Sequence, residues 1–156
     1  MHVAAFLSDN HVTFETIAHP PAFTAQKRAH VLHVTGRQVA KSVLLHGPQG
    51  YFLAILPATH HIDWEVLAAA LGGDIRLATQ SEMADAFRDC EWGVVPPFGT
   101  LYGFASVMDD SLPPEATLVF EGHSHMEAIR LRCRDFENLE HPRRLSFARR
   151  KDTPAA

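Results

Sequence analysis

Two apolar segments of similar length, joined by a short turn sequence, constrain the fold of this chain more than any other feature. Gln38–His46 and Tyr51–Ala58 flank the tetrapeptide Gly47-Pro48-Gln49-Gly50. Because glycine and proline favour tight turns and interrupt regular structure, this order predicts a β-hairpin. Both faces of the first segment are mostly apolar, which indicates that the hairpin is covered on both sides.

Signals for helix boundaries and further strands surround this hairpin. The expected helices comprise residues 2–8, 25–35, 64–71, 80–88 and 135–139, and the other expected strands comprise residues 12–17, 101–107, 117–121 and 127–133. Thr24, Asp63 and Thr79 are candidate N-caps, the last within the capping-box pattern Thr79-x-x-Glu82. Helices and hairpins are interspersed, so we expect an α/β domain of the α+β type with a mixed sheet over residues 1–150. Residues 151–156 are expected to form a flexible tail.

Composition excludes several classes of function. Hydrophobic residues make up 46% of the chain and charged residues 21%, and no apolar run approaches the roughly 20 residues that span a bilayer. The formal net charge of −4 argues against sequence-specific or general DNA binding, because each phosphate contact needs a cation. Local basic clusters still suit contact with a few phosphates. Neither Cys90 nor Cys133 stands in a metal or redox spacing, and the N-terminal segment does not have the pattern of a secretory signal, so we expect a cytoplasmic protein without a membrane partner.

Lys41 occupies an unusual position in the middle of the first hairpin strand. By the two-residue period of a strand it shares a face with the apolar residues Val43 and Leu45. A lysine there reaches a cavity, pairs with a carboxylate or extends its stem to solvent. In a partly desolvated cleft its ammonium would stabilise a phosphate or a developing oxyanion. A lysine that extends to solvent from an edge strand is an equally good interpretation of the pattern.

The segment Gly93-Val94-Val95-Pro96-Pro97-Phe98-Gly99 is a second candidate for a functional element. Its glycines allow close approach of the backbone, while the two prolines stiffen the middle and remove two N–H groups. Such a loop can present fixed amide and carbonyl groups to a ligand. A structural turn between a helix and a strand is the alternative interpretation.

Eleven histidines raise the question of a metal site. His123-x-His125 could place two imidazoles on one side of an extended segment. Metal sites, however, need three or four ligands and usually show an evident motif, which this sequence lacks. We therefore expect no metal and no other cofactor, and a metal-dependent hydrolase that uses His123 and His125 stays as an alternative.

Four features occur in a characteristic order, namely His19-Pro20-Pro21-Ala22-Phe23-Thr24, Lys41, Gly93–Pro97 and Gly122-His123. Over about residues 1–148 this series resembles the YbaK / prolyl-tRNA synthetase editing-domain family of aminoacyl-tRNA deacylases, in particular its freestanding members. The resemblance implies a mixed, curved, barrel-like β-sheet with flanking helices. It also implies metal-independent hydrolysis, in trans, of the ester that links a wrong amino acid to tRNA. The implied partner is the CCA end of an aminoacyl-tRNA, with an aminoacyl-tRNA synthetase as a further one.

The resemblance implies roles for individual residues. Lys41, beside the terminal adenosine, and His123, near the aminoacyl group, would be catalytic. The expected substrate-binding residues are Phe23, Thr24, Ser42, Gly93, Pro96, Pro97, Phe98, Gly99 and Gly122. The alanine-editing branch typically has Asn where this chain has Ser42, so Ala, Cys, Ser and Thr stay open as the edited amino acid. A non-catalytic module of the same fold that binds nucleic acid or a synthetase is the alternative function.

Overall fold

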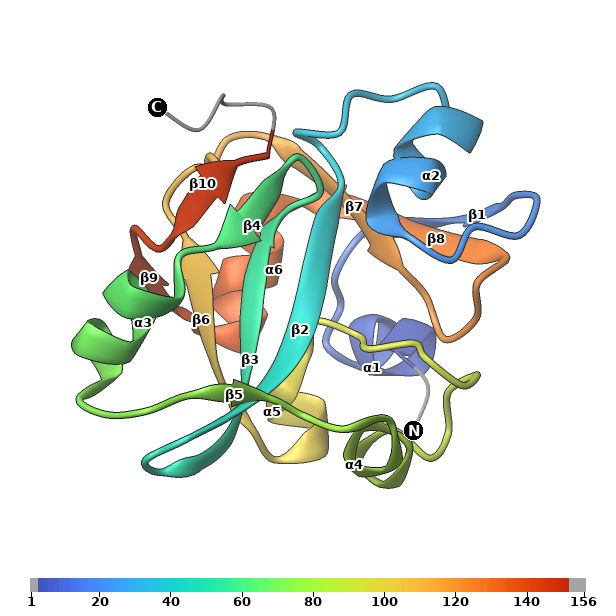
Figure 1. Ribbon diagram of the computed structural model, residues 1–156. Coiled ribbons are helices and arrows are strands. Elements are labelled where there is room, and N and C mark those ends of the chain that lie inside the picture. Colours follow the sequence, from blue (N-terminus) through green and yellow to red (C-terminus); the bar gives the residue numbers. More distant parts are fainter. Residues whose placement is uncertain (1–2, 152–156) are drawn as a thin grey trace.

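The predicted hairpin forms the centre of the largest sheet in the computed structural model, which describes residues 3–151 (Figure 1). Strands β2 (Ala40–Gly47) and β3 (Gly50–Pro57) pair in antiparallel fashion along their whole length. Gly50 in the turn has a φ of 105°, a conformation that favours glycine. The expectation that both faces of the first strand are covered is confirmed for its central residues, since Leu44 and Leu45 are almost fully buried.

Eight further strands complete the three hydrogen-bonded sheets that residues 3–151 form. They are β1 (Phe14–Ala18), β4 (His60–Ile62), β5 (Arg76–Leu77), β6 (Ala105–Asp109), β7 (Thr117–Glu121), β8 (Glu127–Arg132), β9 (Arg143–Leu145) and β10 (Ala148–Arg150). The largest sheet has the order β5-β2-β3-β6-β9, in which β3, β6 and β9 run parallel while β2 is antiparallel to both its neighbours. β1-β8-β7 and β10-β4 form antiparallel sheets. The mixed α/β fold predicted from the sequence is therefore confirmed.

The helices of the described part cover the sheets and cap their ends. They are α1 (Val3–Asp9), α2 (Ala25–Val31), α3 (Trp64–Leu71), α4 (Gln80–Ala86), α5 (Gly99–Tyr102) and α6 (Cys133–Glu140). In Figure 1, α6 lies behind the five-stranded sheet and α2 lies beside β7 and β8. An aromatic core joins these layers, because the ring centroid of Phe98 is 5.3 Å from those of both Phe120 and Phe136. Among residues 3–151, every helix is too short or too polar to cross a membrane.

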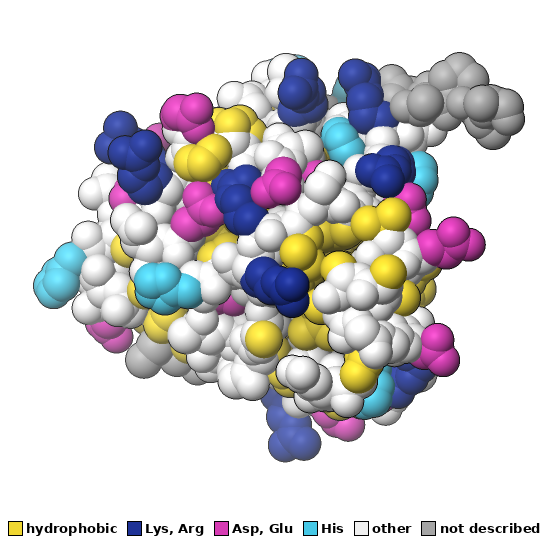
Figure 2. Space-filling view, turned by 90° about the vertical axis from the view of Figure 1, so that its left-hand side faces the viewer, with side chains coloured by type: hydrophobic (Ala, Val, Ile, Leu, Met, Phe, Trp, Pro, Cys, Tyr) yellow, Lys and Arg dark blue, Asp and Glu magenta, His cyan; other side chains and the backbone are white. Residues whose placement is uncertain are grey.

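The surface in Figure 2 carries cations and anions side by side. On this face, Lys and Arg side chains are interspersed with Asp and Glu rather than gathered by sign. Binding to a long stretch of duplex instead requires a continuous row of cations against the phosphates. The face seen in Figure 2 does not present such a row.

The helix caps predicted from the sequence are confirmed. The side chain of Asp63 accepts a hydrogen bond of 3.2 Å from the N–H of Val66, and α3 ends where Gly72 adopts a left-handed conformation. Thr79 and Glu82 form the reciprocal hydrogen bonds of a capping box at the start of α4. Local side-chain chemistry therefore fixes the ends of these helices.

Several predicted boundaries are wrong, each for a local reason. The helix expected over residues 25–35 ends at Val31, because His33 has a φ of 54° and the chain turns before Gly36 is reached. The strand expected over residues 101–107 begins at Ala105, since α5 occupies the preceding residues and ends at Gly103, with a φ of 83°. Strands β4, β5, β9 and β10 are too short for their alternation to be recognised in the sequence.

The barrel-like closure implied by the resemblance is not complete among residues 3–151. An isolated parallel bridge between Val39 and Val119 connects the five-stranded sheet to β7. The strands otherwise form three separate hydrogen-bonded sheets. The first residue of the predicted helix 2–8 and residues 152–156 of the predicted tail lie outside the described residues.

Asp109 anchors the C-terminal strands to the largest sheet. Its buried carboxylate accepts hydrogen bonds of 2.9 and 2.8 Å from the N–H groups of Phe147 and Ala148, and one of 3.0 Å from the N–H of Ser111. These bonds hold the chain where β9 gives way to β10. Backbone donors buried without an acceptor are costly, so the carboxylate is a structural requirement.

We expect Asp109→Ala to lower the free energy of unfolding by roughly 2–4 kcal/mol, because it leaves several backbone N–H groups without an acceptor. Urea denaturation monitored by circular dichroism would measure the change. Asp110→Ala, at the exposed neighbouring position, is the matched control and should unfold like the wild type. Equal stability of the two variants would contradict the anchoring role.

Candidate functional site

A cavity of about 150 Å³ lies between α2, the start of β2 and the segment that precedes α5. Phe23, Ala25 and Arg28 form one wall, and Ala40, Lys41 and Ser42 form another. Gly93, Val95 and Glu121 complete the lining. Figure 1 shows α2 and the segment before α5 on the same side of β2. Residues that are far apart in the sequence thus meet at one small polar cavity.

Lys41 is half-buried in this wall, opposite Leu56 of β3. Burial, followed by the nearby ammonium of Lys151, lowers the pKa of Lys41 to about 8. Burial penalises the charged form, and a like charge penalises it further. Lys151 is brought there by the pairing of β10 with β4, since its N–H donates to the carbonyl of Thr59 over 2.9 Å. Near neutral pH the cavity therefore contains a cation that releases its proton readily.

Ser42 and Gly93 determine how the segment before α5 approaches β2. The hydroxyl of Ser42 donates a short hydrogen bond to the carbonyl of Val95 and thereby ties the segment to the strand. Gly93 has a φ of 87°, in the left-handed region that side chains disfavour. A Cβ at Gly93 would also stand 3.5 Å from Nε2 of His125. The turn at this position therefore depends on glycine.

Arg28 and Glu121 form an ion pair in the cavity wall. Nη2 of Arg28 donates to Oε1 of Glu121 over 2.7 Å and to the carbonyl of Ala22 over 3.2 Å. The side chain of Arg28 is 3% exposed and that of Glu121 16%. Burial raises the pKa of Glu121, against the opposing attraction of Arg28 and His125. The cavity thus presents a carboxylate as well as cations.

His125 connects this ion pair to the surrounding loops. Its Nδ1 is 2.7 Å from Oε1 of Glu121, and its Nε2 is 2.8 Å from the carbonyl oxygen of Trp92. Its backbone N–H donates to Oε2 of Glu91 over 2.9 Å, and its carbonyl accepts from the N–H of Ala22 over 2.9 Å. Both ring nitrogens face oxygen atoms, so either the imidazole carries two protons or Glu121 carries one. The contact between His125 and Glu121 therefore closes one wall of the cavity.

The structure brings some of the predicted site residues together and leaves others apart. Phe23, Lys41, Ser42 and Gly93 line the cavity. The predicted residues outside its lining are Thr24, Pro96, Pro97, Phe98, Gly99, Gly122 and His123.

Local packing explains where most of these other residues lie. Thr24 caps α2 by accepting a hydrogen bond from the N–H of Lys27. Pro96 and Pro97 are buried next to the aromatic core that contains Phe98. A Cβ at Gly99 would stand 2.4 Å from the carbonyl oxygen of Phe104. Close packing therefore requires glycine at position 99.

Gly122 and His123, the last two of the predicted site residues, lie at the turn that follows β7. A Cβ at Gly122 would stand 2.7 Å from Oε1 of Glu127, which is also 3.5 Å from Nδ1 of His123. The ring of His123 is 34% exposed. No group of three or more potential metal ligands occurs among residues 3–151. Both ring nitrogens of His125 are already within hydrogen-bond distance of protein oxygen atoms.

Sequence reasoning missed Arg28 and Glu121 as cavity residues, although signals for both were present. Arg28 follows Ala25 by three positions on α2, so the two share a helical face. Glu121 follows the buried Val119 by two positions on β7 and therefore points to the same side of the sheet. Their charge alone suggested a solvent-exposed position.

The sequence pattern of the aminoacyl-tRNA editing domain matches residues 19–139, which is most of the chain. The chain belongs to the aminoacyl-tRNA editing domain family. This confirms the resemblance seen in the sequence. No protein with a curated description matches this editing domain.

Solved structures have the same fold as this editing domain. A hypothetical protein matches with a TM-score of 0.84 at 16% identity, over 94% of this chain and 99% of its own. A candidate trans-editing enzyme for prolyl-tRNA synthetase matches with a TM-score of 0.82 at 20% identity, over 94% of both chains. A protein from Marinobacter aquaeolei VT8 described as acting in signal transduction matches with a TM-score of 0.74 at 22% identity, over 94% of this chain and 30% of its own. At these identities the likeness shows the fold alone.

We expect His125→Ala to lower the free energy of unfolding of the editing domain by roughly 1–3 kcal/mol, because Glu121 and the carbonyl of Trp92 each lose a hydrogen-bond partner. Urea denaturation would measure the loss. His123→Ala is the matched control and should cost less, since that ring is one-third exposed. A larger loss in His123→Ala would contradict the role assigned to His125.

Proposed function

We propose that the chain hydrolyses, in trans, the ester bond of aminoacyl-tRNA that carries a wrong, small amino acid. The observation that carries this proposal is the small cavity in which Lys41, Arg28 and Glu121 meet, in a chain of the editing domain family. The domain that acts comprises residues 1–150. Its partners are the CCA end of the tRNA and an aminoacyl-tRNA synthetase that produces the error, and the cytoplasm is the compartment that this function implies.

The charges of the cavity suit an aminoacyl ester. Such a substrate has an ammonium group next to the ester carbonyl and a phosphate beyond the ribose. Glu121 offers a carboxylate to the ammonium, while Lys41 offers a cation to the phosphate or to the oxyanion that forms during attack. The same cavity therefore complements both ends of the reacting group.

The reaction needs a positioned water and no covalent intermediate. The water oxygen attacks the ester carbonyl carbon, and the bond from this carbon to the ribose oxygen breaks. Of the two water protons, one goes to the ribose oxygen and the other is released to solvent, and the amino acid leaves as a free carboxylate. An ester is activated enough that fixed backbone groups, an oriented water and one cation suffice. Glu121 lines the cavity and is hydrogen-bonded to His125, so this pair is proposed to relay the proton.

The size of the cavity favours a small amino acid. Its volume is about 150 Å³, and its walls include the small residues Ala25, Ala40 and Ser42. Larger side chains would meet a wall that Gly93 and Val95 hold in place. A single methylene group discriminates by roughly 1–3 kcal/mol, so the preference among Ala, Cys, Ser and Thr rests on polar contacts as well as on size.

The other predicted site residues are proposed to contact the substrate in this cavity or to support its walls. Phe23, Ser42 and Gly93 contact the substrate, and the two prolines hold the loop rigid. His123 is proposed to act at the cavity mouth. If His123→Ala deacylates with the kcat/KM of the wild type, His123 is a surface residue without a role in the reaction.

We expect Lys41→Met to abolish deacylation without lowering the melting temperature at pH 7, because the lysine is held in a setting that disfavours its charge. In the wild type, kcat/KM should fall as the pH rises through about 8, where Lys41 loses its proton. Lys151→Gln should move this midpoint upward, since it removes the neighbouring cation. An unchanged rate in Lys41→Met would overturn the assignment.

The linked effect on stability has a definite sign. The pKa of Lys41 is lower in the folded protein than in the unfolded chain, so the unfolded chain binds more protons above about pH 8. The stability of the wild type should therefore rise relative to that of Lys41→Met between about pH 8 and the ordinary lysine pKa. Urea unfolding of both proteins across this range would measure the difference.

The decisive experiment is deacylation of a panel of mischarged tRNAs with and without EDTA. We expect turnover of at least one tRNA that carries Ala, Cys, Ser or Thr, at a rate that EDTA leaves unchanged. Loss of turnover in EDTA and its recovery with zinc would show a metal mechanism. Tight binding of the panel without turnover would instead identify a non-catalytic module of the same fold.

A further inference from the structure

Three large apolar side chains are exposed near the Lys41 cavity, on loops that meet at His125, and one of them, Phe23, lines the cavity. Phe23, Trp92 and Met126 are 71%, 62% and 54% exposed. Each lies on a different loop, and all three loops meet at His125. The Phe23 ring centroid is 4.8 Å from that of His125, the carbonyl of Trp92 faces Nε2 of His125, and Met126 follows His125 in the chain. We refer to these three residues as the apolar rim.

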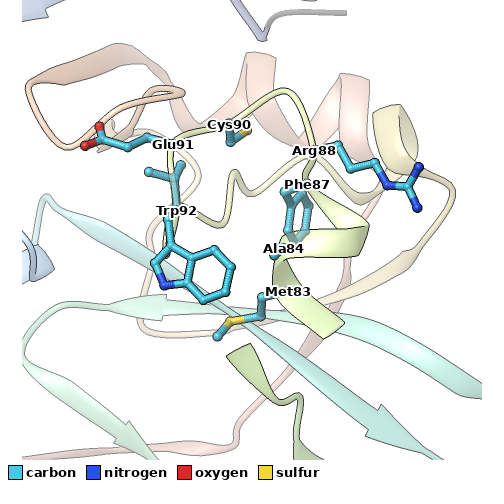
Figure 3. Close-up of a pocket in the computed structure, with 9 residues that line it drawn as sticks. Met83, Ala84, Phe87, Arg88, Cys90, Glu91 and Trp92 are labelled. Carbon is cyan, nitrogen blue, oxygen red and sulfur yellow. The ribbon is translucent and has the colours of Figure 1, made fainter. Parts of the chain in front are cut away.

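A second cavity, of about 210 Å³, opens beside Trp92. Figure 3 shows the indole of Trp92 on one side of it, with Met83 and Phe87 of the α4 region opposite. The exposed Arg88 also contributes to the lining. Gly93 lines this cavity as well as the cavity of Lys41. The two cavities are therefore neighbours that share one residue of their walls.

An exposed indole beside an apolar recess suits a flat heteroaromatic ligand. Nucleobases stack on aromatic side chains whatever their sequence, and proteins that bind single-stranded RNA use such platforms together with cations. The 3′ end of an aminoacyl-tRNA is single-stranded and places a base one ribose away from the ester. A ligand whose ester lies in the Lys41 cavity thus carries its base toward the neighbouring recess.

Resting on the proposed function, we propose that Trp92 and the recess beside it bind the terminal adenine base of the tRNA. The base stacks on the indole, and its apolar edge lies toward Met83 and Phe87. Arg88 contributes to the edge of this recess and is proposed to offer a cation to the RNA backbone. Position 92 then contributes to binding of the RNA end, while the Lys41 cavity contacts the amino acid.

The test uses an RNA minihelix with a single-stranded CCA end in which 2-aminopurine replaces the terminal adenine. Stacking quenches the fluorescence of this base, so the signal reports the proposed contact without any chemical step. We expect the wild type to quench it, and Trp92→Leu to abolish quenching and to weaken binding roughly 5- to 100-fold. Trp92→Phe should retain part of both effects, because it keeps an aromatic face.

The second tryptophan provides a matched control. Trp64 is 41% exposed at the start of α3, and Trp64→Leu should quench and bind as the wild type does. Circular dichroism would confirm that both variants are folded. If Trp92→Leu quenches and binds like Trp64→Leu, the inference is overturned.

Failure of this inference can be told apart from failure of the proposed function. Deacylation by the wild type, together with unchanged 2-aminopurine quenching in Trp92→Leu, would overturn the inference alone. Quenching that depends on Trp92 in a protein that deacylates no tRNA of the panel would uphold the base site and overturn the hydrolytic function. A fall in deacylation by Trp92→Leu with normal quenching would also overturn the base site.

Discussion

The hydrogen bonds of His125 hold the functional region together. Its ring and backbone contact the loop that ends in Phe23, the turn at Trp92 and the carboxylate of Glu121. These segments belong to three distant parts of the sequence, and the sheets alone do not fix their mutual positions. The wall of the cavity therefore depends on one buried imidazole, both of whose nitrogens make hydrogen bonds to protein oxygen atoms.

The charges of the cavity depend on the same framework. Arg28 and Glu121 face each other because α2 packs beside the end of β7. Lys41 reaches the same cavity from β2 of the five-stranded sheet. Burial keeps the pKa of Lys41 low and that of Glu121 high. Buried groups that are perturbed in opposite ways are typical of sites where charge and protons are exchanged. The fold therefore creates an electrostatic setting that none of the three residues has alone.

Much of the fold and part of the candidate site could be predicted from the sequence, because interactions between neighbouring residues determine them. The β2–β3 hairpin and the caps at Asp63 and Thr79 follow from turn and capping residues within a few positions. Lys41 could be predicted as a candidate site residue because its charge interrupts an apolar strand. The short strands β4 and β10 form only through distant pairing, and no local pattern marks them.

The pairing of Arg28 with Glu121 could not be predicted from the sequence, since 93 residues separate them in the chain. Each of them looks like an ordinary surface charge within its own segment. Helical and strand periodicity could have oriented both toward the interior, but neither pattern identifies the partner. His125 posed the same difficulty, because its role arises from loops that meet only in the folded protein.

The small residues that line the Lys41 cavity have a consequence for how such a protein diversifies. Ala25 lies on a regular helix and is only partly buried, so it can change in size more readily than Ala40, which packs in the core, or Ser42, whose hydroxyl ties the strand to Val95. Gly93 is restricted by its positive φ. Under the proposed function, substitution of Ala25 would therefore change which amino acid is accepted, while the charged groups and the glycine turn stay constant.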